Sequence, residues 1–196
     1  MVGFGAKQAW LAVRGVDQQA LVDALGLRDL GEVPWRDGLD VAHLTDDRIA
    51  VTPALDGWTL AVGRRLLNHP ADVVDLSGRL GTEVQQFATH RVTEIHRWQR
   101  AEKGELIRAF GYVGQTGDVT TWFGDPTPVE LELGLPPVYL AAEPVTLEEE
   151  LAALVAEETT ILVSEQDVLR VAGAWSIDPS RLGAPAPGRL RVGAVL

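Results

Sequence analysis

Short apolar runs, separated by glycine, proline and aspartate, make up most of the first 124 residues. A buried strand is predicted at 8–14, where such a run ends at Gly15. A helix is predicted at 17–25, because apolar residues recur there at helical spacing until Gly26. Asp17 is suited to cap the start of that helix.

The next segment is less periodic. Residues 28–47 predict a loop with one short helix near 35–43. A strand is then predicted at 48–52, and Asp56-Gly57 predicts a tight hairpin turn into a strand at 58–63. A second helix is predicted at 72–80. The remaining strands are expected at 83–92, 95–101, 106–113 and 119–123, with Lys103-Gly104 as a hairpin turn.

The predicted order, β-α-β-β-α-β, matches the start of a ferredoxin-like fold. We therefore expect an α+β fold: an antiparallel sheet with that start, extended by a β-meander and a C-terminal helical region. Three parts are expected within one compact unit. Residues 1–124 form the sheet domain, 125–182 form an acidic helical region packed on it, and 183–196 form a tail with a short strand near 190–195.

The helical region contains three predicted helix starts. Thr127 is followed by Pro128 and by Glu130, the pattern of a capping box. The same logic places helix starts at Thr146 and Ser164.

Composition narrows the possible functions. The chain has no Cys, which excludes disulfides, thiolate metal sites and a cysteine nucleophile, and which suits a cytoplasmic location. The net charge of −11 disfavours nucleic acid and anionic membranes as partners. No apolar run approaches the roughly 18 residues that span a bilayer. Residues 1–7 lack the pattern of a secretory signal.

The negative charge is concentrated in one stretch. Residues 125–167 carry eleven Asp or Glu and no Lys or Arg, whereas the rest of the chain has 17 acids and 17 Lys or Arg. One interpretation is a solvated helical surface whose acids offset helix dipoles. The other is an acidic surface that binds a basic protein or mimics nucleic acid. The candidate partner-binding residues are Glu148, Glu149, Glu150, Glu157 and Glu158.

A second group of candidates lies on strands 87–112. The residues that could line a polar ligand groove are His90, Glu94, His96, Arg97, Trp98, Arg108 and Tyr112. A two-residue turn at Lys103-Gly104 predicts Arg97 opposite Phe110 and Trp98 opposite Ala109. Arg97 and Arg108 would then share one face, and His96 and Trp98 the other. Cross-strand stabilisation alone also explains this pattern.

Other chemistry is poorly supported. His90 and His96 would lie about 20 Å apart along an unbroken strand, so no metal site is predicted. Ser77 lacks the nucleophile-elbow sequence, and Ser164 is better explained as a helix cap. No cofactor motif is present, and no catalytic residue is assigned.

Four segments are considered together: AWLAVR at 9–14, VTPALDGWTL at 51–60, VQQFATHRV at 84–92 and DVLRVAGAWSIDP at 167–179. They resemble a family of uncharacterised actinobacterial proteins. The resemblance implies a bacterial cytosolic protein. It implies no activity and no catalytic residue.

The leading hypothesis is a non-enzymatic protein-interaction module, similar in manner to immunity or antitoxin proteins, that binds a basic partner through its acidic surface. The alternative is an enzyme or small-ligand binder that uses the polar groove on strands 87–112. A third hypothesis is a structural or oligomeric component. The sequence specifies neither the partner nor the oligomeric state.

Overall fold

The structure is a computed structural model that describes residues 1–135, 163–183 and 185–195. Its elements are β1 (Ala9–Arg14), α1 (Gln18–Ala24), β2 (Leu27–Val33), α2 (Trp35–Leu44), β3 (Arg48–Val51), β4 (Trp58–Val62), α3 (Arg64–Asn68), α4 (Val73–Leu80), β5 (Glu83–His90), β6 (Ile95–Glu102), β7 (Glu105–Val113), β8 (Asp118–Phe123), α5 (Pro128–Glu132), α8 (Glu165–Trp175), a 3-10 turn (Pro179–Arg181) and β9 (Leu190–Val195).

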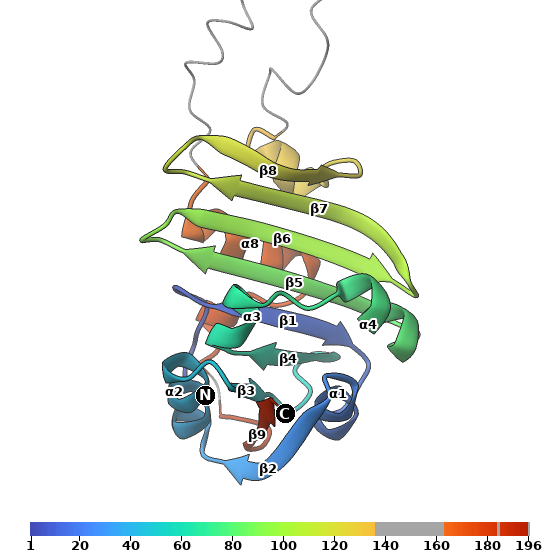
Figure 1. The fold of residues 1–196 in the computed structure, drawn as a ribbon, viewed down its shortest axis with the longest axis vertical. Coiled ribbons are helices and arrows are strands. Elements are labelled where there is room, and N and C mark those ends of the chain that lie inside the picture. The colour runs from blue at the N-terminus through green and yellow to red at the C-terminus, as the bar shows by residue number, and fades with distance from the viewer. Residues whose placement is uncertain (136–162, 184, 196) are drawn as a thin grey trace, which may run out of the picture.

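The described strands form one nine-stranded antiparallel sheet in the order β2-β9-β3-β4-β1-β5-β6-β7-β8 (Figure 1). The α+β class with an antiparallel sheet and a β-meander is therefore confirmed. The strand predicted near 190–195 is also confirmed, and it lies inside the sheet between β2 and β3.

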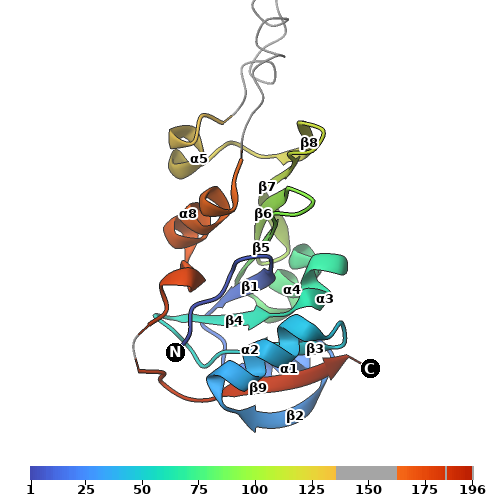
Figure 2. The same cartoon turned by 90° about the vertical axis from the view of Figure 1, so that its left-hand side faces the viewer.

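Helices cover both faces of the sheet. Side chains alternate between the two faces along each strand, so a strand such as β1 has apolar side chains to bury on both sides. On one face, Trp10 and Ala12 of β1 pack in a cluster with residues of α2 and α8. On the other, Leu11 and Val13 pack with residues of α1, α3 and α4. In side view, α5 and α8 lie on one side of the strands β5–β8 and α3 and α4 lie on the other (Figure 2).

The segment 28–47 departs most from prediction. A loop with one short helix near 35–43 was expected; α2 confirms the helix, but the strand β2 was not predicted. β2 is an edge strand whose side chains are mostly exposed, so it lacks the apolar alternation that predicts a strand. Gly38 lets α2 approach the sheet, because a Cβ there would lie 2.9 Å from the side chain of Leu190.

Both predicted hairpin turns are confirmed. Asp56-Gly57 and Lys103-Gly104 have positive φ at both residues, as a tight two-residue hairpin turn requires. The predicted register beyond Lys103-Gly104 was wrong by one residue. β7 contains a bulge next to Arg108, so that Trp98 pairs with Phe110 and Arg97 with Gly111.

The capping boxes at Thr127 and Ser164 are confirmed at the starts of α5 and α8. The helix predicted to start at Thr146 lies outside the described residues. Within the described part, no helix has the length and apolar character needed to cross a bilayer.

Candidate functional site

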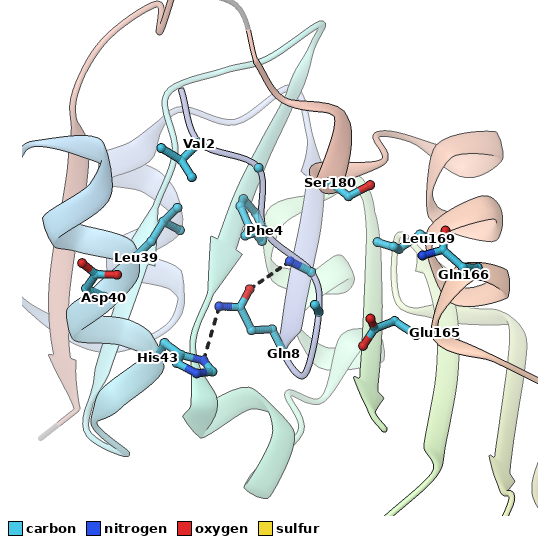
Figure 3. A pocket seen from close by; sticks show the side chains of 13 residues that line it. Val2, Phe4, Gln8, Leu39, Asp40, His43, Glu165, Gln166, Leu169 and Ser180 are labelled. Carbon is cyan, nitrogen blue, oxygen red and sulfur yellow. Dashed lines mark hydrogen bonds between the residues drawn. The ribbon is translucent and has the colours of Figure 1, made fainter. Parts of the chain in front are cut away.

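A cleft of about 420 Å³ lies between α2 and α8 (Figure 3). Phe4, Leu39 and Leu169 give it apolar walls, and all three side chains belong to or border the buried core. The residues preceding β1 run through the cleft and supply part of its lining. The cleft therefore joins three segments that are distant in sequence.

Backbone hydrogen bonds hold this N-terminal segment in place. The Phe4 amide donates to the Pro179 carbonyl at 3.1 Å, and the Lys7 amide donates to Glu165 Oε2 at 3.1 Å. Gly5 has a φ of +122°, and a Cβ there would lie 2.8 Å from Leu169. Glycine at position 5 thus permits the segment to lie against α8.

The polar side chains of the cleft are linked through Gln8. Its Oε1 accepts a hydrogen bond from the Gly5 amide at 3.0 Å, which directs its Nε2 toward His43 Nδ1 at 3.4 Å. Because the amide nitrogen donates, Nδ1 of His43 is the acceptor. The proton of the neutral ring then lies on Nε2, the other ring nitrogen.

The cleft has an acidic character. Asp40 of α2 and Glu165 of α8 line it from opposite sides, and no Lys or Arg is among its described lining residues. Ser180 also lines it, but its hydroxyl donates to Asp178 at 2.6 Å in a local turn. Nothing here activates a nucleophile. The arrangement is suited to binding a cationic group that carries an apolar stem.

The predicted groove residues do not meet in one place. Four of them, His96, Trp98, Arg108 and Tyr112, are buried beneath α5 and α8. His90 and Arg97 line cavities on the opposite face of the sheet. Glu94 is exposed in the turn between β5 and β6, with φ +49°.

The buried members form a structural network around Glu130. Its Oε1 accepts from Trp98 Nε1 at 2.7 Å and from Arg108 Nε at 2.9 Å. Its Oε2 accepts from the amide and hydroxyl of Thr127. Sequence reasoning identified Glu130 as a capping residue but missed its pairing with Arg108, which lies 22 residues earlier.

His96 belongs to the same buried side of the sheet. Its Nδ1 lies 3.0 Å from the hydroxyl of Thr89. Burial lowers the pKa of His96, although the negative charges of Glu165, Asp167 and Glu94 partly oppose that effect. This histidine is held neutral inside the fold and is not presented to a ligand.

None of the five predicted partner-binding acids lies among the described residues. Glu148, Glu149, Glu150, Glu157 and Glu158 lie outside the described residues. Of the acids in 125–167 that are described, Glu130 is buried in the network and Glu132 pairs with Arg170 at 2.7 Å. Glu165 faces the cleft, and Asp167 completes the capping box of α8.

Across residues 1–135, 163–183 and 185–195, no group of three or more His, Asp or Glu side chains is arranged to hold a metal ion. Comparison with protein-family models, curated proteins and solved structures finds no match. The resemblance to actinobacterial proteins therefore stays a prediction.

Proposed function

We propose that the protein is a non-enzymatic interaction module that binds a basic protein partner through an acidic surface, in the manner of immunity or antitoxin proteins. The observation that carries the proposal is the cleft between α2 and α8, which Asp40 and Glu165 line together with apolar side chains and which has no Lys or Arg among its described lining residues.

The chemistry of the cleft supports a basic side chain as the occupant. An Arg or Lys has an apolar stem that can lie against Phe4, Leu39 and Leu169, and a cationic end that can reach a carboxylate. Glu165 belongs to the acidic stretch 125–167, near its C-terminal end, so this stretch supplies part of the lining of the cleft. A field of one sign also speeds association with a basic partner.

A defined peptide tests this proposal. A short peptide that alternates arginine and leucine is titrated into the full chain by calorimetry at several salt concentrations. We expect affinity to fall as salt rises, because salt screens charge attraction. The combined variant Asp40→Asn with Glu165→Gln is expected to weaken binding by about tenfold or more.

The control variant combines Glu105→Gln with Asp118→Asn. It removes the same charge from two exposed residues that have no ion pair among the described residues. It is expected to change affinity by no more than about twofold. Equal losses in both variants, or binding that does not respond to salt, would contradict the proposed role of the cleft.

For the fold, we propose a ferredoxin-like relation among β1, α1, β3, β4, α4 and β5. The spatial order β5-β1-β4-β3 supports it, and so does the packing of α1 and α4 on the same sheet face. In this proposal β2, α2 and α3 are insertions, and β6–β8 extend the sheet beyond β5. We likewise propose that the C-terminal helical region packs on this sheet, as α8 does.

A further inference from the structure

Arg97 lies on the face of the sheet that α8 does not cover, and it lines two cavities there. One, of about 180 Å³, is bordered by Gln99 and Thr121. The other, of about 210 Å³, is bordered by His90 and Thr93. Arg97 is the residue that both cavities share, so one guanidinium group can serve a ligand in either of them.

The charge of Arg97 is not balanced by a carboxylate. Its Nη2 donates to the Leu67 carbonyl at 2.6 Å, while its Nε is buried without a hydrogen-bond partner. No ion pair of Arg97 exists among the described residues. Arg108 on the other face, by contrast, is paired with Glu130. Burial lowers the pKa of Arg97, which reflects the cost of holding this cation partly out of water.

The cavities beside Arg97 have apolar walls with a few polar side chains, such as Gln99 in the first and Thr93 in the second. Neither cavity has an Asp or Glu among its described lining residues. Asp46, which accepts from the Asn68 amide beside the second cavity, already pairs with Arg64 at 3.2 Å. A half-buried cation that has no carboxylate partner among the described residues and that lines two cavities is a chemical setting in which an oxyanion is stabilised.

We propose that Arg97 binds the carboxylate or phosphate group of a small organic anion in these cavities. The guanidinium group, which lines both cavities, donates to the oxyanion, and the hydroxyl of Thr93 and the ring of His90, which lie 2.8 Å apart, border it in the second cavity. The cavities are too small for a folded partner, and they lie below the roughly 300–1,000 Å³ of pockets that hold drug-sized ligands, so they suit only a small anion. This site is independent of the acidic cleft.

The test uses inorganic phosphate and acetate as probes, each compared with sodium chloride at equal ionic strength. Arginine Nε–H signals are directly observable by NMR in ¹⁵N-labelled protein. We expect saturable shifts of the Arg97 Nε–H signal and of the Thr93 amide. A larger response to phosphate than to acetate assigns the ligand to phosphate compounds, and the reverse order assigns it to carboxylates.

The variant Arg97→Gln is expected to lose these shifts, with apparent affinity reduced by about tenfold or more. The control is Arg91→Gln, which removes the same charge from an exposed residue on the neighbouring turn and should keep the response. If Arg97→Gln fails to fold, Arg97→Lys is used, because it keeps the charge but loses the planar donor pair, and weaker binding is expected. Shifts no larger than those from chloride, or shifts that persist in the Arg97 variant, would overturn the proposal.

Discussion

Arg108 and Glu130 form an ion pair inside the protein, with Nε 2.9 Å from Oε1 and side chains that are 1% and 0% exposed. The pair fixes α5 to the outer part of the sheet, since Arg108 lies on β7 and Glu130 on the helix. Arg108 is satisfied further by the Ala109 and Phe123 carbonyls, and its guanidinium lies 4.2 Å from the centre of the Trp122 ring.

Replacing Glu130 with Gln is expected to lower the free energy of unfolding by about 3–5 kcal/mol, because Arg108 is left as a buried charge without a counter-ion. The control is Glu132→Gln on the same helix, whose exposed pair with Arg170 should contribute no more than about 1 kcal/mol. Urea unfolding measures both. Similar decreases in the free energy of unfolding in the two variants would mean that the buried pair contributes no more to stability than the exposed pair.

Trp98→Phe is expected to destabilise the protein by about 1–3 kcal/mol beyond the loss of ring area, because Glu130 loses a buried donor at 2.7 Å. Trp58→Phe provides the comparison, since Trp58 is buried and its ring lies 4.8 Å from the Arg14 guanidinium, a contact that Phe can keep, but its side chain has no hydrogen bond among the described residues. Chemical denaturation of both variants separates the hydrogen bond from the packing. A Trp98 variant no less stable than the Trp58 variant would contradict this assignment.

Stability is expected to fall as pH is lowered through about 6.5, the ordinary pKa of histidine. His96 has a pKa below that value in the folded protein because it is buried, so the unfolded chain takes up its proton first and is favoured by acid. Urea midpoints measured on both sides of that pH should show the decrease. His96→Gln should reduce its slope, whereas His69→Gln, which alters an exposed residue, should not. An unchanged slope in the His96 variant would show that another group is responsible.

Gly5→Ala is expected to detach the N-terminal segment from α8, because Ala would be strained at φ +122° and its Cβ would meet Leu169. Strain of this kind costs on the order of 1–3 kcal/mol. Hydrogen exchange should show faster exchange at the Phe4 and Lys7 amides. Gly26→Ala also has a positive φ but meets nothing within 4 Å, so it should leave those amides protected.

Sequence patterns predicted the features that depend on a few adjacent residues. The turns at Asp56-Gly57 and Lys103-Gly104 and the capping boxes at Thr127 and Ser164 all follow from local backbone preferences. The strand β2 was missed because it is exposed at the sheet edge and carries polar side chains. Its pairing with β9 depends on residues more than 150 positions later.

The predicted arrangement of the polar groove on strands 87–112 was wrong because β7 contains one bulge. An extra residue in β7, between the partners of Arg100 and Ala101, reverses which side chains of β7 share a face with those of β6. Arg108 is thereby placed with Trp98 in the core, and Arg97 faces the opposite side. Such a bulge has no distinct local signal in the residues around Ile107. The acidic cleft was also beyond prediction, because its walls come from the N-terminal segment, α2 and α8.

The position of β9 has a consequence for the order of folding. β9 joins β3 to β2, and its partners Val51 and Val33 precede it in the chain by well over a hundred residues. The strands β3, β4, β1 and β5–β8 can pair with one another before residues 190–195 have been synthesised. β9 is the strand that pairs with β2 and with the outer edge of β3. Until residues 190–195 have been synthesised, the edges of β2 and β3 that β9 later covers stay unpaired. This long-range closure is expected to be the slow step of folding.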